Sequence, residues 1–252
     1  MFYLDFYIPW IFEGMNIRIG RYISVPDIEA QLAPQNPMFT HSILYNFDPF
    51  TQTGIITTTQ INKNWRIQLG ISASDDTAPW SKDAEPAGAL MFQWISNSNR
   101  DSLYFGANSF NDGLFHYNNL QMYVAQYNHK FNDVVNTNFE GYYMYQRHVP
   151  DLPRSGKFSY APEWGIVNYT FFRLARNTFL TVRNEYYNDK KGQRTGFPTY
   201  YTEHAIGITY WPNSIVTIRP EIRFDHAYQT KAYNNGTGRS QFMAAMDIIF
   251  HY

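Results

Sequence analysis

The chain has 252 residues, which is enough for one large all-β domain or two ordinary domains. Its 20 basic and 21 acidic residues leave a formal net charge of −1. This balance argues against nucleic acid as a partner, because phosphate binding requires a clear basic excess. The chain has no cysteine, which excludes disulfides, thiolate metal sites and cysteine nucleophiles.

Hydropathy argues against a helical membrane protein. The mean hydropathy is −0.45, and no run approaches the ~18 apolar residues of a membrane-spanning helix. A transmembrane β-barrel has no such run, because only every second residue of each strand faces lipid. The first residues, MFYLDFYIPW, also lack the basic segment and cleavage site of a secretory signal. We therefore expect either that the protein is not exported or that its true start lies upstream.

Apolar and polar residues alternate with a period of two over most of the chain, and no long segment shows helical periodicity. This alternation predicts about 13 strands. In chain order they begin near Phe2, Met15, Gly54, Trp65, Ala87, Ser102, Tyr117, Val134, Pro162, Thr178, Thr199, Ser214 and Arg239. The clearest strand runs from Ile215 to Asp225, with charged residues on one face and none on the other. Both faces of residues 163–173 are mixed, and the alternation does not assign them.

Short and long connections alternate between these strands. The short turns lie near residues 12–14, 62–64, 97–101, 131–133, 174–177 and 211–214. The longer loops lie near residues 22–52, 74–86, 111–116, 148–160, 189–198 and 226–238. This pattern is typical of an up-and-down transmembrane barrel, which has short turns at one end and longer loops at the other. We therefore predict one all-β, antiparallel barrel domain over residues 1–252.

A soluble β-sandwich is the competing fold. It would use strands of about 5–6 residues and Greek-key connections. The predicted strands instead average roughly 10–13 residues, close to what a tilted membrane strand needs. Aromatic residues, at 19% of the chain, also cluster near strand ends, as in Tyr186-Tyr187 and Tyr210-Trp211. Interfacial girdles of a membrane barrel favour that placement.

The strand count suggests that part of the barrel precedes Met1. Bacterial single-chain barrels have an even number of strands, whereas about 13 are predicted here. We therefore expect that the chain lacks about three N-terminal strands of a barrel of about sixteen, together with a signal peptide. A paired strand hidden in the long loop of residues 22–52 is the alternative explanation of the odd count.

Charged residues on one strand face and in the long loop are the candidate pore residues. Asp27 and Glu29 lie between prolines in the loop of residues 22–52. The strand residues expected to face the lumen are Arg18, Arg66, Arg183, Arg219, Glu221, Arg223 and Asp247. Loop acids opposite wall arginines would create a transverse field that selects solutes by charge. Alternatively, these charges pair with one another and simply keep the lumen wet.

Residues for catalysis or metal binding are not expected. The seven histidines are scattered singly, and none has the spacing of a nucleophile or metal motif. We predict no catalytic residue, no metal and no cofactor. At the other end of the chain, Phe242, Ile248, Phe250 and Tyr252 form the apolar face of a last strand that ends on an aromatic residue. Such an ending resembles the signal that the outer-membrane assembly machinery recognises.

The most distinctive motifs of the chain lie in residues 18–54, namely Arg18-Ile19-Gly20-Arg21-Tyr22, Pro26-Asp27-Ile28-Glu29, Asn36, Phe39-Thr40-His41-Ser42 and Thr53-Gly54. In these motifs the sequence resembles the OmpL-like β-barrel porin family. The resemblance implies a porin in the outer membrane of a Gram-negative bacterium, with a loop near the pore. Family members begin with a signal peptide and further strands, which supports the expectation of missing N-terminal strands.

Together these observations predict a passive channel for small hydrophilic solutes. Its partners would be outer-membrane lipid, the solutes, the assembly machinery and further copies of itself, and not nucleic acid. A structural or adhesive barrel plugged by the long loop is the alternative. A soluble, carbohydrate-binding β-sandwich is the second alternative.

Overall fold

The computed structural model describes residues 1–24, 27–116, 118–151 and 157–251. These residues form thirteen β-strands, one 3-10 helix and one α-helix. The strands are β1 (Phe2–Ile8), β2 (Met15–Ile23), β3 (Thr51–Gln60), β4 (Trp65–Asp75), β5 (Ala87–Ile95), β6 (Asp101–Phe110), β7 (Gln121–Lys130), β8 (Val135–Pro150), β9 (Phe158–Ala175), β10 (Thr178–Asp189), β11 (Thr199–Tyr210), β12 (Val216–Ala227) and β13 (Ser240–Phe250). The helices are η1 (Ala33–Gln35) and α1 (Ile43–Phe47).

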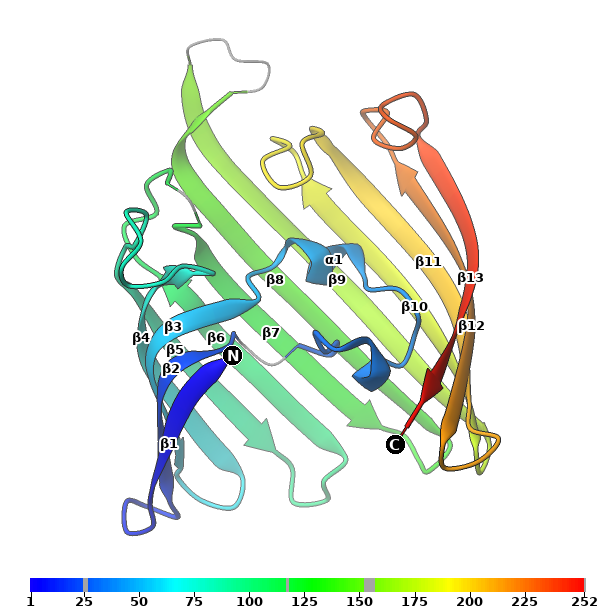
Figure 1. Cartoon of the computed structure of the whole chain (residues 1–252), viewed down its shortest axis with the longest axis horizontal. Coiled ribbons are helices and arrows are strands. Elements are labelled where there is room, and N and C mark those ends of the chain that lie inside the picture. The colour runs from blue at the N-terminus through cyan, green and yellow to red at the C-terminus, as the bar shows by residue number, and fades with distance from the viewer. Residues whose placement is uncertain (25–26, 117, 152–156, 252) are drawn as a thin grey trace. The chain divides into compact units, whose positions relative to one another are not determined.

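All thirteen strands belong to one sheet, and their order in the sheet is their order in the chain (Figure 1). Neighbouring strands pair antiparallel, as between β10 and β11, where the register runs from Thr178 opposite Tyr210 to Asp189 opposite Thr199. β1 and β13 are the two ends of this order. The up-and-down arrangement and the strand count expected from alternation are therefore confirmed.

The chain divides into two compact units, which are described separately. The first unit contains residues 1–26, 48–127 and 142–163. The second contains residues 27–47, 128–141 and 164–252. Strands β10 to β13 lie wholly in the second unit, whereas β1 to β6 lie wholly in the first. No helix among the described residues is long and apolar enough to cross a membrane.

In the second unit, the strands have two chemically distinct faces. One face of β9 to β12 is covered by residues 27–47 and carries Tyr169, Arg183, Glu203 and Glu221, all at most 2% exposed. We call it the covered face. On the opposite, apolar face, Ile206 and the other outward residues of these strands are partly exposed. Because side chains alternate across a strand, one register places all the charges on the covered face.

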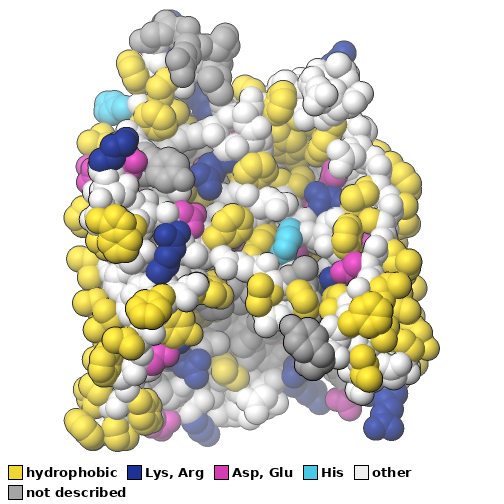
Figure 2. All heavy atoms as spheres, viewed as in Figure 1, with side chains coloured by type: hydrophobic (Ala, Val, Ile, Leu, Met, Phe, Trp, Pro, Cys, Tyr) yellow, Lys and Arg dark blue, Asp and Glu magenta, His cyan; other side chains and the backbone are white. Residues whose placement is uncertain are grey.

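The apolar face continues to the last strand. Phe242, Ile248 and Phe250 are 69%, 49% and 68% exposed on β13. Hydrophobic side chains gather along the margin of the molecule that β12 and β13 form (Figure 2). The alternation expected for this strand is therefore present, while Tyr252 lies outside the described residues.

The covered face of β9 explains why residues 163–173 have no readable alternation. Gly165 and Val167 are buried there. A Cβ atom on Gly165 would lie 3.1 Å from Leu44 Cδ1 and 2.9 Å from Tyr187 Cδ2. Because the helix α1 packs on this part of the strand, apolar and small residues occupy a face that is polar elsewhere.

The short helix α1 is a feature that sequence periodicity did not predict. It has only five residues, too few for a helical period to show. Ser42 acts as its N-cap, because its Oγ accepts a hydrogen bond from Tyr45 N at 3.1 Å. Ile43, Leu44 and Tyr45 are buried, and the helix lies over β9 and β10 (Figure 1).

The first unit has a polar and an apolar face of its own. On the polar face, Arg66 donates hydrogen bonds to Gln60 Oε1 and Gln93 Oε1, both at 3.0 Å. On the apolar face, Leu69 and Leu90 are directly paired across β4 and β5. The same pairing places Ile67 opposite Phe92.

Candidate functional site

Acidic side chains of the second unit bind the backbone of residues 27–47. Glu140 Oε2 accepts a hydrogen bond from Ile28 N at 2.7 Å. Glu221 Oε2 accepts one from Thr40 N at 2.9 Å. Glu185 accepts from Ile43 N at 2.7 Å and also from the next backbone N–H. These carboxylates therefore accept hydrogen bonds from buried backbone N–H groups, which would otherwise need water as their acceptor.

Basic side chains bind the carbonyl oxygens of the same segment. Arg183 Nη1 lies 2.6 Å from the Thr40 carbonyl oxygen. Arg223 Nη1 lies 2.6 Å from that of His41, and Arg219 Nη1 lies 2.5 Å from that of Asn36. At the end of α1, Arg194 Nε donates to the Phe47 carbonyl oxygen at 3.0 Å. The segment is thus held along its length by charged side chains that contact its main chain.

The charged groups of the covered face also pair with one another. Arg183, which is fully buried, forms ion pairs with Glu203, with Glu29 at 3.4 Å and with Glu221 at 3.7 Å. Arg223 Nη2 lies 3.1 Å from Glu203 Oε2. Buried charges are tolerated only with such partners, because removing them from water is costly.

Glu29 is the acid that ties the segment to itself. Its carboxylate accepts from Ser42 N at 2.9 Å and from Ser42 Oγ at 2.6 Å, and His41 Nδ1 lies 3.6 Å away. Burial works against ionisation of this carboxyl. The neighbouring His41 side chain, the Arg183 charge and the Ser42 hydrogen bonds outweigh that effect, so the pKa of Glu29 is lowered from its ordinary value of 4.5. Glu29 therefore remains a carboxylate at neutral pH.

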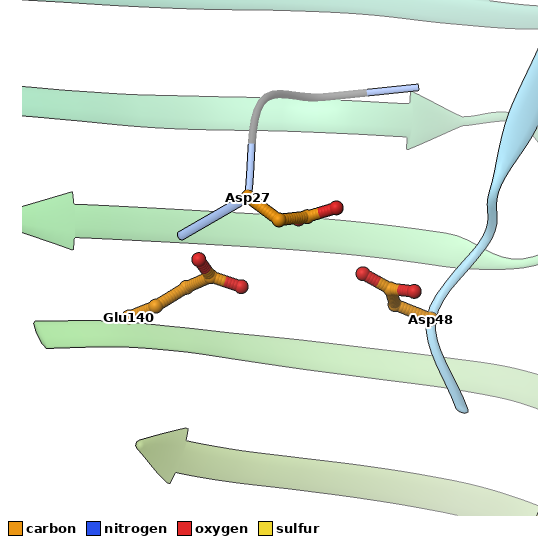
Figure 3. A group of neighbouring side chains, drawn as sticks. All are labelled: Asp27, Asp48 and Glu140. Atoms are coloured by element: carbon orange, nitrogen blue, oxygen red, sulfur yellow. The ribbon is translucent and has the colours of Figure 1, made fainter. Parts of the chain in front are cut away.

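Asp27 and Glu140 form a second acidic contact at the start of the segment. One carboxylate oxygen of each lies within 4.8 Å of the other. Both side chains are labelled in Figure 3. Asp48, also labelled in Figure 3, belongs to the first unit. Asp27 is half-buried, whereas Glu140 is buried. Glu29 is also buried, so Asp27 is the more accessible of the two loop acids singled out in the sequence.

The remaining predicted pore residues have different surroundings. Arg219 forms an ion pair with Asp247, whose side chain is 22% exposed, at the β12–β13 pairing. In the first unit, Arg18 Nε and Nη2 bind the two carboxylate oxygens of Asp5, each at 2.8 Å. The Arg18 and Asp5 side chains are 33% and 38% exposed. Arg18 therefore contacts a partner that the sequence did not single out.

The structure brings most of the predicted charges together. Those gathered around segment 27–47 in the second unit are Glu29, Arg183, Arg219, Glu221, Arg223 and Asp247. Arg18 and Arg66 lie in the first unit. Sequence reasoning missed Glu185 and Glu203 as members of this charged cluster, although both lie on the charged face of their strands. Extending the alternation through 199–210 would have found Glu203.

The strand order, the apolar face and the charged covered face are those of the porin class of antiparallel β-proteins, in a sheet that, over the described residues, is not closed between β1 and β13. A family model described as "Putative beta-barrel porin-2, OmpL-like" matches residues 2–252. Because this is nearly the whole chain, the chain belongs to that OmpL-like family of porins. The resemblance of residues 18–54 to this family is therefore confirmed. A comparison with curated proteins gave no significant match.

Solved porin structures share the fold at very low sequence identity. The outer-membrane channel DcaP of Acinetobacter baumannii is 9% identical, with a TM-score of 0.59 over 94% of this chain and 73% of that one. The anion-selective porin from Comamonas acidovorans is 9% identical, with a TM-score of 0.60 over 94% and 74%. OmpT of Vibrio cholerae is 10% identical, with a TM-score of 0.60 over 98% and 78%. At such identities the likeness shows the fold alone.

Proposed function

We propose that the protein is a passive channel for small hydrophilic solutes, in which segment 27–47 narrows the lumen. The main support is the docking of that segment onto the covered face, where carboxylates bind its N–H groups and arginines bind its carbonyl oxygens. Family membership supports the porin activity itself. In this proposal the apolar face contacts lipid and the covered face borders the water-filled lumen.

The charged residues would divide into two roles. Glu29 and Arg183 are almost fully buried, so we assign them to holding the segment in place. Asp27, Arg18, Arg66 and Asp247 retain partial exposure, so we assign them to the electrostatic filter that solutes meet. Exposed charges of this kind raise the local concentration of counter-ions and repel like charges.

Single-channel recording in planar bilayers tests the channel activity. The expected result is discrete conductance steps. A variant in which a Gly-Ser linker of equal length replaces residues 30–45 should conduct more than the wild type. If the wild type shows no steps while the linker variant does, the protein is a barrel plugged by the segment. If neither shows steps, the channel proposal is wrong.

The reversal potential under a salt gradient tests the filter. Asp27→Asn removes one accessible negative charge and should shift selectivity away from cations. Asp133→Asn is the matched control, because Asp133 is an exposed acid in the turn between β7 and β8. An unchanged reversal potential in Asp27→Asn would remove Asp27 from the filter.

We also propose that the protein forms an oligomer in the outer membrane. One solved form of OmpT from Vibrio cholerae, with a TM-score of 0.59 to this chain, is a trimer. We extend an assembly of identical subunits to this protein, inserted in an outer membrane by the assembly machinery that serves β-barrels. Chemical cross-linking in the native membrane should yield a discrete oligomer; monomers alone would contradict this part.

A further inference from the structure

A groove opens on the apolar face of the first unit, across β5 to β8. Its volume is about 800 Å³. Aromatic side chains line its apolar part, namely Phe92, Phe105, Phe110, Tyr123 and Tyr145. The small residues Ala107 and Ala125 also line it. A volume of this size falls within the ~300–1,000 Å³ typical of ligand sites.

The pairing of the strands places this groove on the face that a porin turns to lipid. Phe92 is paired with Phe105, and Leu90 with Ala107, so these four side chains share one face of β5 and β6. Gln93 and Tyr104 are paired on the opposite, polar face, where Tyr104 binds Gln68. The groove therefore belongs to the apolar surface and not to the polar face that carries Arg66.

One end of the groove is polar and includes a cation. Asn111, Gln121 and Arg147 line it where β6, β7 and β8 meet the connection of residues 111–120. The Arg147 Cζ lies 6.0 Å from the centre of the Tyr145 ring, and the side chain is exposed. Among the residues that the structure describes, no carboxylate forms an ion pair with Arg147.

The nearby acid Asp112 is engaged by other donors. Its Oδ1 accepts hydrogen bonds from Leu114 N and Asn119 Nδ2, both at 2.9 Å. The Leu114 hydrogen bond, the Asn119 hydrogen bond and the Arg147 charge lower the pKa of Asp112. Asp112 thus moderates the positive potential at this end without occupying the guanidinium.

We propose that this groove binds a phosphate-bearing membrane lipid, with an acyl chain along Phe92 and Phe105 and the phosphate against Arg147. The apolar part of the groove would contact the acyl chain. An arginine at the edge of a membrane attracts an anionic headgroup. The order of the two parts fits a lipid: hydrocarbon toward the middle of the strands, charge at their ends. This assignment goes beyond solute passage, since it concerns the outward surface.

Native mass spectrometry of the detergent-solubilised protein tests the proposal with two lipids that differ only in the phosphate. Dioleoyl phosphatidic acid should form a one-to-one complex, and dioleoylglycerol should bind at least severalfold more weakly. Arg147→Gln should weaken binding of phosphatidic acid roughly tenfold, the loss expected for a charge-assisted contact of about 1.5 kcal/mol. Arg100→Gln, which changes an exposed arginine in the turn between β5 and β6, is the matched control and should bind like the wild type.

A second variant separates the acyl-chain site from the headgroup site. Ala107→Phe fills the groove without changing its charge and should reduce binding of both lipids. Unchanged conductance and heat stability of each variant show that it is folded. Equal binding of the two lipids, or full binding by Arg147→Gln, would overturn the phosphate assignment. Full binding by Ala107→Phe would overturn the groove itself, and a wild type that binds neither lipid would overturn the whole proposal.

Discussion

Arg183 donates a hydrogen bond to the Thr40 carbonyl oxygen at 2.6 Å and another to Thr40 Oγ1 at 2.8 Å, across 143 positions of sequence. The same guanidinium is paired with Glu203 and lies 3.4 Å from Glu29. The single guanidinium of Arg183 therefore binds both the strands and segment 27–47 of the second unit.

Arg183→Met should both destabilise the protein and loosen the segment. The substitution leaves Glu29, Glu203 and Glu221 without their common cation, and breaking a buried ion pair from one side costs about 3–5 kcal/mol. Urea unfolding in lipid vesicles measures the stability, and single-channel conductance should rise. Arg66→Met, which loses two hydrogen bonds to glutamines, is the control and should cost only about 1–3 kcal/mol. Equal losses in the two variants would remove Arg183 from its central role.

The Thr40 hydroxyl should contribute separately from the Thr40 main chain. It donates to Glu221 and accepts from Arg183 and Arg223, so Thr40→Val leaves three charged groups short of a partner without changing the side-chain shape. The expected loss in the free energy of unfolding is about 1–3 kcal/mol. Thr40→Ser keeps the hydroxyl and should lose much less. A serine variant as unstable as the valine variant would show that the methyl group contributes as much as the hydroxyl, which contradicts the leading role given to the hydroxyl.

Acid should release the segment through Glu29. Its pKa is lowered below 4.5 in the folded protein, so its contribution to stability is complete above pH 4.5. The contribution is lost as the pH falls through the lower, folded-state pKa. The difference in unfolding free energy between the wild type and Glu29→Gln should therefore be constant near neutral pH and shrink only below pH 4.5. A difference that shrinks already between about pH 7 and 5 would contradict the lowered pKa.

A charge on the apolar face should be far more costly than one on the covered side at the same depth. Ile222 is 50% exposed near the middle of β12, and Ile222→Lys should lose about 2–4 kcal/mol in a bilayer. Ala245 on β13 is paired with Glu221 on the opposite face, so Ala245→Lys should lose much less. Folding titrations in vesicles measure both. Equal losses would show that the two faces are not lipid and lumen.

The strands were largely predictable because their faces differ in chemistry. In β12, Arg219, Glu221 and Arg223 share one face with no apolar residue between them, and a period of two is enough to read that pattern. β9 does not follow this pattern, since Gly165 lies beneath the helix α1 and Val167 is buried on the same face, which is charged elsewhere. Only the position of a distant segment explains that exception.

Some members of the charged cluster could be read from the sequence, but their burial could not. Glu29 was expected in the loop opposite wall arginines such as Arg183, and the two side chains lie 3.4 Å apart. Alternation shows the side of a strand on which a residue lies, but not whether a loop covers that side. The main-chain contacts of Glu185 and Arg219 were out of reach for the same reason.

A main-chain contact does not depend on which side chain the bound residue carries. Many residues of the segment can therefore be substituted while its main-chain contacts with the strands are kept. Proline is the exception at Ile28, Thr40, Ile43 and Leu44, where the N–H itself is bound. An engineer who wants a different filter can change the side chains of the segment and leave the wall untouched.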